Sequence, residues 1–443
     1  MNTMNIAIIG GGLTGVTAAI RAAQLGHHVD VYESASELGG RTRSFFHAPT
    51  QSWIDNGPHL LIGAYTQTIN LLKEVKAEQN ITWQDSLTLP LWDEYRGHFA
   101  LKTSPHLPFS LALMRAVQQL PQHGIKILPS LLRMAISLKM NGLKMNGLKT
   151  NKAMSGTVSE WMQKARIHPS LQRDLLEVLC LGAMNEVMDT ANAASFSEVL
   201  RRAFDKHRSA RLGWFSQPLS QALIAPLENH CKSLGVQIHR SSRVLKLTQT
   251  GQQTQLLTRH SEQDYDAIIF ATAPSVRNQL LGIKHEKDQA IETRPICNIH
   301  LWFEENITLA SPFVGGIGTY GQWFFDISQQ MHEKIALSHI CAVISADNNL
   351  KSHDEQLAAV IKELQAITHR HDLTPKYHHI ITVQAATHVV RPHTTAELPK
   401  TWVDACEQPL PGELPATIES AVLRGEQAAN TCHQLSKLRS STL

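Results

Sequence analysis

One short segment near the N-terminus restricts the fold of this chain more than any other. It reads NIAIIGGGLTGVTAAIRAAQLGHHVDVYES and divides into an apolar strand at residues 5–9, a turn with Gly10, Gly12 and Gly15, a helix, and a second strand that ends at Glu33. In a G-x-G-x-x-G turn, the first glycine lets the chain reverse, the second lets a pyrophosphate approach the backbone, and the third lets helix and strand pack closely. The segment therefore predicts a strand–helix–strand unit that binds a dinucleotide.

The acidic residue at the end of this unit indicates which dinucleotide the site accepts. Glu33 lies eighteen residues after Gly15, where a carboxylate accepts hydrogen bonds from the hydroxyl groups of a ribose. The same carboxylate repels a 2′-phosphate, so we expect that the site does not take NADP. A glycine turn without a ligand is the alternative, but the flanking strand, helix and second strand are the context that dinucleotide binding requires.

A second glycine-rich element follows the second strand directly. Residues 37–43 read ELGGRTR, so two glycines precede two arginines whose guanidinium groups suit phosphate oxygens. Here the chain resembles the superfamily of FAD-dependent amine oxidases and phytoene desaturases, whose members carry a GG-R element at this point. The resemblance implies that Gly39, Gly40 and Arg41 contact a tightly bound FAD. The alternative is a glycine turn with solvated arginines.

The C-terminal segment is expected to complete the cofactor site. In PGELPATIESAVLRGEQAA, Pro415 stands where proline is favoured, at the first turn of a helix. The free N–H groups of Ala416, Thr417 and Ile418 would then form a positive helix end. Such an end stabilises the negative charge that a reduced flavin carries near N1 and O2.

The superfamily resemblance assigns two further contacts with FAD. It implies that Asp404 meets the ribityl or pyrophosphate region and that the backbone of Val244 contacts adenine. Relatives usually carry a glycine before this aspartate, whereas this chain reads Trp402-Val403-Asp404. With the N-terminal unit, these positions predict an FAD site assembled from three separate pieces of the chain.

A narrower resemblance begins at Asp55. The segments DNGPHLLIGAY (residues 55–65), LEVLCLGAMNEV (residues 176–187) and LPATIESAV (residues 414–422) are similar, in this order, to the hydroxysqualene dehydroxylase family of squalene-associated FAD-dependent desaturases. Superfamily members place a glycine against the flavin here, which implies the same for Gly57. The resemblance implies that the substrate is a triterpene alcohol, hydroxysqualene, and that hydride from reduced flavin converts it to squalene in bacterial-type hopanoid biosynthesis.

Two other functions remain open. A carotenoid or terpenoid desaturase or isomerase shares the fold, the cofactor and a lipid substrate, and composition does not exclude it. A protein of another class, a flavin-bearing scaffold, would hold neighbouring terpenoid synthases at the membrane without turnover. An amine oxidase would need aromatic residues beside the flavin before the last helix, and CEQPLPGELPAT has none.

Dehydroxylation requires a general acid, because hydroxide leaves poorly unless it is protonated. Four residues are candidates for this role: Asp55, His59, Glu177 and, as a hydrogen-bond donor only, Tyr65. His59 ranks first, because it lies in the segment expected to face the flavin and because histidine titrates near neutrality. Asp55 can instead be the carboxylate of a structural turn, and Glu177 can pair with an arginine.

A segment without acidic residues predicts contact with an anionic membrane. From Tyr95 to Ser159 the chain has no Asp or Glu but nine Lys and Arg residues. Cations near anionic lipid, together with buried apolar groups, would hold the protein peripherally. The expected apolar groups are Leu107, Phe109, Leu111, Leu113 and Met114, followed by one helical face with Leu131, Leu132, Ala135 and Leu138. The alternative is an ordinary helical region whose basic side faces water.

A tandem repeat lies within this segment. Residues 138–149 read LKMNGLKMNGLK, and a period of five residues turns a helix by about 140° per copy, so the repeat cannot keep one face. Each copy also contains Asn-Gly, which favours turns. We therefore expect the repeat to be a mobile loop.

Charge, cysteine spacing and hydrophobicity restrict the partners and the location that we expect for this chain. The 443 residues include 41 Lys plus Arg and 38 Asp plus Glu, so the formal net charge of +3 gives no reason to expect nucleic acid. The six cysteines form no CxxC pair, and no histidine spacing indicates a metal. No segment is apolar for long enough to span a bilayer. We expect a cytoplasmic protein that is held peripherally on the inner face of the membrane.

Together these features predict a mixed α/β fold. It consists of a Rossmann-like FAD-binding domain, an inserted α+β substrate domain and a helical, membrane-facing subdomain. The expected boundaries are 1–95 for the first FAD-binding part with the start of the substrate domain, 96–205 for the helical basic and apolar region, 206–275 for the second FAD-binding part, 276–395 for the substrate domain and 396–443 for the third FAD-binding part.

Overall fold

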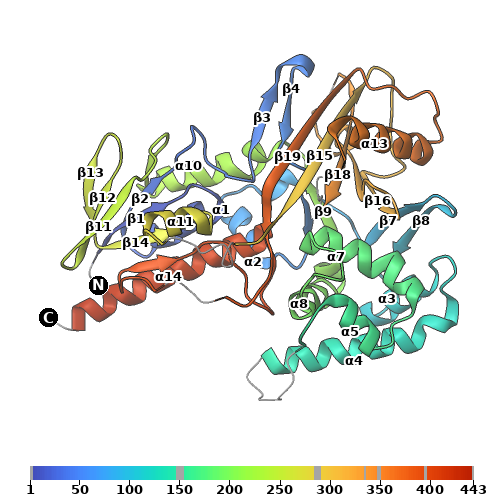
Figure 1. Ribbon diagram of the computed structural model, residues 1–443, viewed down its shortest axis with the longest axis horizontal. Helices are drawn as coiled ribbons and strands as arrows, with labels where there is room; N and C mark the ends of the chain where they lie inside the picture. The colour runs from blue at the N-terminus through green and yellow to red at the C-terminus, as the bar shows by residue number, and fades with distance from the viewer. Residues whose placement is uncertain are drawn as a thin grey trace.

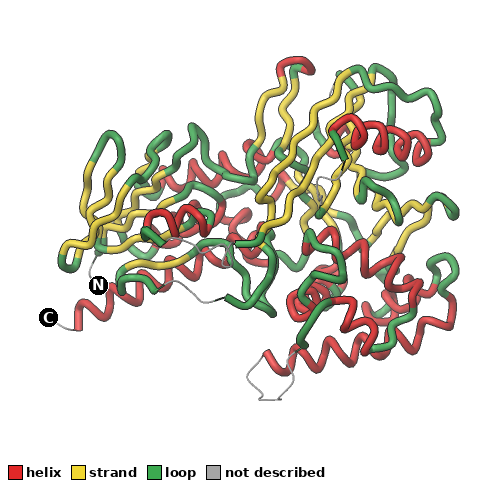
Figure 2. Tube along the Cα trace, viewed as in Figure 1, coloured by secondary structure: helices red, strands yellow, loops and turns green. Residues whose placement is uncertain are grey.

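The computed structural model describes residues 3–145, 154–283, 291–333, 336–346, 351–393 and 397–441. A parallel sheet with its helices lies at the end of the molecule that carries both termini, and a larger, mostly antiparallel sheet lies at the other end (Figure 1). Helices gather below the larger sheet, where few strands are found (Figure 2). The protein is thus a mixed α/β fold with a helical region beside its second sheet.

The parallel sheet takes its strands from three distant stretches of the chain. In spatial order it contains β10 (Gln237–His239), β2 (His28–Tyr32), β1 (Asn5–Ile9), β14 (Ala267–Phe270) and β20 (Trp402–Asp404). Every neighbouring pair is parallel. The strands therefore end at one common edge, where the loops that follow them meet.

Both faces of this sheet are covered, as parallel sheets require. Side chains alternate along β1, so Ile6 and Ile8 join one apolar cluster while Ala7 and Ile9 join another. The first cluster includes α1 (Leu13–Gln24), α10 (Ala225–Ser233) and α14 (Ile418–Ser441). The second includes the antiparallel strands β11 (Lys246–Thr250), β12 (Gln253–Leu257) and β13 (Glu262–Tyr265).

The second sheet has seven strands and separates two apolar clusters. Its order is β19 (Tyr377–His388), β15 (Thr293–Phe303), β18 (Ser338–Ser345), β17 (Trp323–Asp326), β16 (Phe313–Ile317), β7 (Thr88–Asp93) and β8 (Gly97–Lys102). Along β18, Ile340, Ala342 and Ile344 pack with α13 (His353–Thr368), whereas Cys341 and Val343 join the cluster of the helical region. The sheet therefore presents an apolar face to those helices.

The helical region follows β8 in the chain. It contains α3 (Phe109–Gln118), α4 (Leu128–Met145), α5 (Val158–Lys164), α6 (Pro169–Leu171), α7 (Glu177–Met184), α8 (Ala193–Ala203) and α9 (His207–Ala210). Asp174 is fully buried here and accepts hydrogen bonds from Arg96, His123 and Arg173. Arg96, one of the nine cations of the acid-free segment, is therefore held inside the protein and is not free to contact lipid.

Shorter elements connect the two sheets. They are the hairpin β3 (Ser44–His47) and β4 (Ser52–Asp55), the small sheet β5 (Leu60–Ile62), β9 (Leu212–Phe215) and β6 (Ile81–Trp83), and the helices α2 (Thr66–Glu74), α11 (Pro274–Leu280) and α12 (Ile327–Gln330). The β4–β5 connection contains Asn56, Gly57, Pro58 and His59. This connection runs between the parallel sheet and the larger sheet.

The expectation of a loop at the tandem repeat is wrong for its first copy, because α4 continues to Met145. Leu131, Met134 and Leu138 anchor this helix in the core of the helical region, and propagation of a helix that is already nucleated costs little per residue, even at Gly. The part of the repeat after Met145 lies outside the described residues. Leu132 and Ala135 are exposed. The expectation that they share one face with Leu131 and Leu138 is therefore wrong.

Candidate functional site

The first glycine turn is open toward a cavity at the common edge of the parallel sheet. Gly10 has φ +108, and a Cβ atom there would lie 2.5 Å from the Ala271 oxygen. At Gly12, no atom of the described chain lies within 4 Å of the Cβ position. No side chain caps the start of α1 within the described residues. The N–H groups at this helix start are therefore available to an anion, and the backbone leaves room for it.

The second glycine element lies directly beside the first. Gly39 donates a backbone hydrogen bond of 2.9 Å to the Gly11 oxygen and forms a parallel bridge with Gly12. Gly39 and Gly40 have φ +108 and +56, which glycine adopts without the penalty that other residues meet. The two elements form one continuous backbone wall of the cavity, although more than twenty residues separate them in the sequence.

Glu33 and Val244 line the same end of the cavity. The Glu33 carboxylate accepts hydrogen bonds from the N–H groups of Gly11 at 2.7 Å and Ala35 at 2.8 Å, so it is held at the end of β2. Gly15 does not line the cavity. A Cβ atom there would lie 1.9 Å from the Gly10 oxygen, so this glycine serves the close packing of α1 against β1.

A single cavity of about 1020 Å³ joins this polar end to an apolar chamber. Its polar end is lined by the two glycine elements, Glu33, Ser34, Ser242, Arg243 and Val244. Its apolar end lies between the larger sheet and the helical region and is lined by Leu87, Leu89, Leu101, Leu179, Leu181, Val199, Leu200, Trp323, Phe325 and Val343. A ligand in the apolar chamber can therefore reach a dinucleotide bound at the polar end without leaving the protein.

The β4–β5 connection forms part of the wall between these two ends. Gly57, Pro58 and His59 all line the cavity. Asn298 of β15 donates a hydrogen bond of 2.9 Å to the Asn56 oxygen, and its side chain leaves no room for a Cβ atom at Gly57. His59 Nδ1 lies 2.7 Å from the Gly57 oxygen. Because a carbonyl oxygen only accepts, His59 must donate from Nδ1.

This hydrogen bond decides what His59 can do when it is neutral. Burial lowers the pKa of His59, and the charge of Arg41 lowers it further against the opposing effect of the Gly57 oxygen. The neutral ring therefore carries its proton on Nδ1 and a lone pair on Nε2. It can act as a general acid only after Nε2 takes up a proton.

The start of α14 also lines the cavity, with Ala416, Thr417 and Ile418. The helix begins at Ile418, so Pro415 precedes it and does not form its first turn. Contrary to the expectation of a free N–H group, the Thr417 N–H donates to the Ser420 hydroxyl at 2.9 Å. The Tyr65 hydroxyl forms a hydrogen bond with the Thr417 side chain. Burial and the Glu419 charge together raise the pKa of Tyr65. Tyr65 therefore stays protonated and can donate a hydrogen bond.

The expected role of Asp404 is not supported by its position. Asp404 pairs with Arg277 and does not line the cavity. Glu407, three residues further on, does line it and is buried. Ala405 extends the pairing of β20 with β14 by donating to the Phe270 oxygen at 2.8 Å, so the chain crosses the edge of the sheet only after Asp404. Glu407 is thus the carboxylate that reaches the cavity after β20, and the sequence signal for it was the small pair Ala405-Cys406 that precedes it.

A buried cluster of charges surrounds Glu407. Its carboxylate accepts hydrogen bonds from both terminal nitrogens of Arg41 and lies 2.9 Å from His388 Nδ1, while Arg424 is 3.5 Å away. Burial opposes ionisation, but Arg41, His388 and Arg424 hold the pKa of Glu407 well below its usual range. Arg41 lines the cavity, and its contact with FAD stays a prediction. Its guanidinium is already bound by Glu407 and the Ala386 oxygen.

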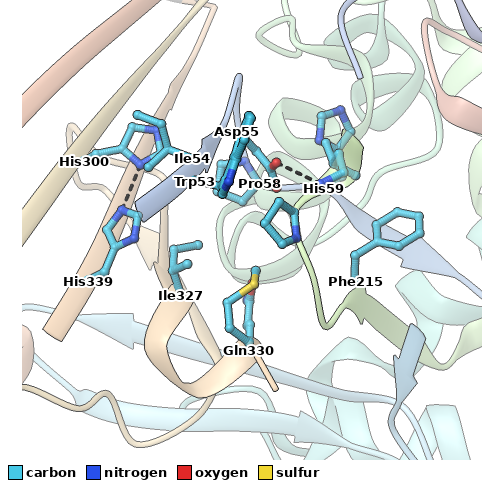
Figure 3. Close-up of a pocket in the computed structure, with 13 residues that line it drawn as sticks. Trp53, Ile54, Asp55, Pro58, His59, Phe215, His300, Ile327, Gln330 and His339 are labelled. Atoms are coloured by element: carbon cyan, nitrogen blue, oxygen red, sulfur yellow. Dashed lines mark hydrogen bonds between the residues drawn. The ribbon is translucent and has the colours of Figure 1, made fainter. Parts of the chain in front are cut away.

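Two candidate acids lie outside the large cavity. Glu177 is exposed on α7. Asp55 lines a separate void of about 20 Å³ (Figure 3), which is large enough for about one water molecule. The Asp55 carboxylate accepts hydrogen bonds from the Ser44 hydroxyl at 2.6 Å and the Leu219 N–H at 2.9 Å. Burial raises the pKa of Asp55 to about 6, and its two partners hold it at the end of the β3–β4 hairpin.

The same void lies beside two buried histidines of the larger sheet (Figure 3). His300 Nδ1 lies 2.9 Å from His339 Nε2. Burial lowers the pKa of His300 to about 3 and that of His339 well below its usual value. In the described part of the chain, no three His, Cys, Asp or Glu residues are grouped so that they could hold a metal ion.

These observations fit a flavin dinucleotide. The open backbone at Gly12, the uncapped start of α1 and the ribose-directed Glu33 suit a diphosphate and its ribose. Tyr65 and the residues at the start of α14 line the same cavity. These residues would hold the isoalloxazine ring.

We expect Glu407→Gln to destabilise the protein far more than Asp404→Asn. The Glu407 side chain is 6% exposed and is contacted by Arg41, His388 and Arg424, so its removal leaves several groups without their carboxylate and costs about 3–5 kcal/mol. The Asp404 side chain is 28% exposed, so water can take its place beside Arg277 and the loss is about 1 kcal/mol or less. Urea unfolding of the flavin-free protein would measure both changes. Equal losses in the two variants would contradict the assignment of Glu407 as the central carboxylate.

The pH dependence of the unfolding free energy tests the assignment of Glu407 independently. Because the folded-state pKa of Glu407 is lowered, its contribution is complete above the unfolded-state pKa of about 4.3 and is lost as pH falls below that value. Between about pH 5 and pH 3, the wild type should therefore lose more unfolding free energy than Glu407→Gln.

Proteins of two kinds are similar in sequence to this chain. The 15-cis-phytoene desaturase of Glycine max is 24% identical over 319 residues, which cover 69% of this chain and 55% of that protein. The chain thus spans about half the length of such plant relatives. The hydroxysqualene dehydroxylase of Sinorhizobium fredii is 25% identical over 450 residues, which cover 96% of this chain and 97% of that protein.

Solved structures share the fold. An oxidoreductase from Methanosarcina mazei superposes with a TM-score of 0.71 at 15% identity, covering 96% of this chain and 100% of that one. Cyclohexylamine oxidase from Brevibacterium oxydans gives a TM-score of 0.66 at 16% identity, covering 98% and 100%. The family model described as flavin containing amine oxidoreductase matches residues 13–398. The chain therefore belongs to the flavin-containing amine oxidoreductase family and is an FAD-dependent oxidoreductase.

Proposed function

We propose that this protein catalyses the reductive dehydroxylation of hydroxysqualene to squalene. The observation that carries the proposal is the cavity, whose polar end suits FAD and whose other end is a chamber of aliphatic and aromatic side chains. A long hydrocarbon substrate gains about 25 cal/mol for each Å² of apolar surface that it buries in such a chamber. The hydroxysqualene dehydroxylase of Sinorhizobium fredii also aligns along nearly its whole length, unlike the plant desaturases.

The reaction breaks a C–O bond, forms a C–H bond and releases water, so it consumes one hydride and one proton. Bound FAD in its reduced form supplies the hydride. The chain must hold the hydroxyl-bearing carbon at the junction of the two ends of the cavity, exclude water and deliver the proton. Leu179, Leu181 and Trp323 line the apolar chamber, and such side chains exclude water, which strengthens hydrogen bonds made there.

His59 is the proposed proton donor. It lies at the junction, and its Nδ1–H bond to the Gly57 oxygen holds the ring and leaves Nε2 directed elsewhere. The protonated ring would give the Nε2 proton to the departing hydroxyl group. Tyr65, which stays protonated, can donate a second hydrogen bond to the same oxygen.

Anaerobic reaction of the reduced protein with hydroxysqualene tests the function. The absorbance of oxidised flavin should return, and mass spectrometry should find squalene, a product that has lost one oxygen. Reduced flavin that persists in the presence of substrate would instead favour a non-catalytic scaffold. A product that has lost two hydrogens, formed by the oxidised protein, would identify a desaturase.

We predict that His59→Ala retains FAD but slows this single-turnover reoxidation by about 10²–10⁴, the usual contribution of a general acid. His59→Gln is the matched control, because its amide can still donate to the Gly57 oxygen but cannot deliver a proton. Both variants should be equally slow. If glutamine restores the rate, His59 only positions the β4–β5 connection.

The pH dependence follows from the same role. A general acid works in its protonated form, so the wild-type rate should rise as pH falls through the pKa of His59, which burial holds below its usual value. The two variants should lack this rise. An identical pH profile in the wild type and in His59→Gln would exclude His59 as the acid.

We also propose that the helical region docks on an anionic bilayer, from which so insoluble a substrate would enter. On α4, Leu132, Ile136 and Met140 are at least half exposed and recur at intervals of four residues, which puts them on one face. Leu111 of α3 and Ile125 are also exposed. Arg115, Lys126 and Lys139 are exposed on the same or adjoining elements, so apolar and cationic groups coincide as membrane-surface helices require.

The docking surface differs from the one expected from the sequence. Phe109 and Leu113 pack partly buried against the core, and Arg133 donates to the backbone oxygens of Ala165 and Arg166. Within the described residues, no helix is long and apolar enough to cross a membrane. Contact through one helical face is therefore the mode of binding that we propose.

We predict that replacing Arg115, Lys126 and Lys139 together by Glu weakens binding to phosphatidylglycerol vesicles on the order of a hundredfold, at about 1 kcal/mol for each cation. Cosedimentation at several salt concentrations would measure this change. The matched control replaces Lys73, Lys246 and Lys362, exposed cations of other surfaces. Equal losses in the two triple variants, or equal binding to neutral vesicles, would contradict the docking surface.

A further inference from the structure

Arg424 of α14 lies where a cofactor contact was not expected. Its neighbour Gly425 packs against the first turn of α1, since a Cβ atom at Gly425 would lie 2.5 Å from the Thr14 oxygen. Arg424 itself lines the large cavity. It follows Ile418, at the start of α14, by six residues, which is about 9 Å along a helix. Arg424 is therefore set back from the helix start that suits a flavin ring, toward the helix start that suits phosphate.

The Arg424 side chain is mostly buried, and its ion pair is long. Its only ion pair within the described residues is with Glu407, at 3.5 Å. Its Nε atom is buried and has no hydrogen-bond partner in the described part of the chain. Burial lowers the pKa of Arg424, and Arg41 lowers it further, while Glu407, Cys406 and the exposed Glu413 oppose this shift.

The single carboxylate of Glu407 is largely occupied by other groups. Arg41 donates to it from both terminal nitrogens, and His388 contacts it through both its backbone N–H and Nδ1. Two arginines thus share one buried acid, which leaves an excess positive charge in the cavity wall. A buried charge without a full partner is costly, so its presence beside a ligand cavity points to a ligand of opposite charge.

We propose that Arg424 binds an anionic group of FAD, and specifically its diphosphate. Both phosphates of a dinucleotide are ionised at neutral pH, and a guanidinium gives them paired, charge-assisted hydrogen bonds. The N–H groups at the start of α1 and the fork of Arg424 then contact the diphosphate from two sides. The assignment depends on FAD as the cofactor and not on which lipid the protein reduces.

Flavin affinities of the flavin-free protein test the assignment. Arg424→Gln should weaken FAD roughly ten- to a hundredfold, the effect of losing a hydrogen bond to a charged group, and should reduce the salt dependence of FAD binding. Riboflavin, which has the ring but no phosphate, should bind both proteins equally. Arg424→Lys, which keeps the charge but loses the planar fork, should fall between Arg424→Gln and the wild type.

Arg21→Gln is the matched control. Arg21 has nearly the same side-chain exposure, 21% against 19%, and is ion-paired on the adjacent α1, but it does not line the cavity. Arg21→Gln should lower the melting temperature and leave FAD affinity unchanged. Flavin-free Arg424→Gln should melt no lower than wild type, because it removes a poorly paired buried charge. Equal weakening of FAD and riboflavin, or a shift confined to the flavin reduction potential, would place Arg424 at the ring and overturn the assignment.

Discussion

The close packing around the first turn of α1 is the constraint on which the rest of the structure depends. Gly15 lies so near the Gly10 oxygen, and Gly425 so near the Thr14 oxygen, that neither position has room for a Cβ atom. These contacts bring β1, α1 and α14 together from opposite ends of the chain. The backbone of the phosphate-directed turn, the neighbouring GG element and the start of α14 consequently line one cavity.

One end of the cavity is polar and the other is apolar, because two different sheets form them. The edge of a parallel sheet supplies loops with free N–H groups, whereas the larger sheet and the helical region supply side chains. The β4–β5 connection, fixed by Asn298, lies between them and brings His59 to the point where a polar cofactor and an apolar ligand meet. Two physical effects lower the pKa of His59 there: burial and the positive charge of Arg41.

Burial also separates the four candidate acids, which the sequence could only list. Glu177 is on the surface, Asp55 is fixed by two hydrogen bonds beside a separate void, and Tyr65 is kept protonated. His59 alone combines access to the cavity with a ring nitrogen that can change its protonation. Tertiary contacts also change the reading of the acid-free segment. The sequence suggests that Arg96 and Arg133 are surface cations, but both donate hydrogen bonds to other protein groups.

The sequence by itself determined the strand–helix–strand unit, both glycine elements and the mixed α/β class, because each depends on backbone geometry encoded by neighbouring residues. It also located His59, Gly57 and Arg41, which line the cavity. Only the tertiary structure decided that Glu407 and not Asp404 reaches this cavity, that α4 extends through the first repeat, and that Arg424 lacks a full partner. Arg41 and Glu407 are 366 positions apart in the chain. Local patterns fix the conformation of a segment, whereas charge pairing and burial depend on which distant segments the fold brings into contact.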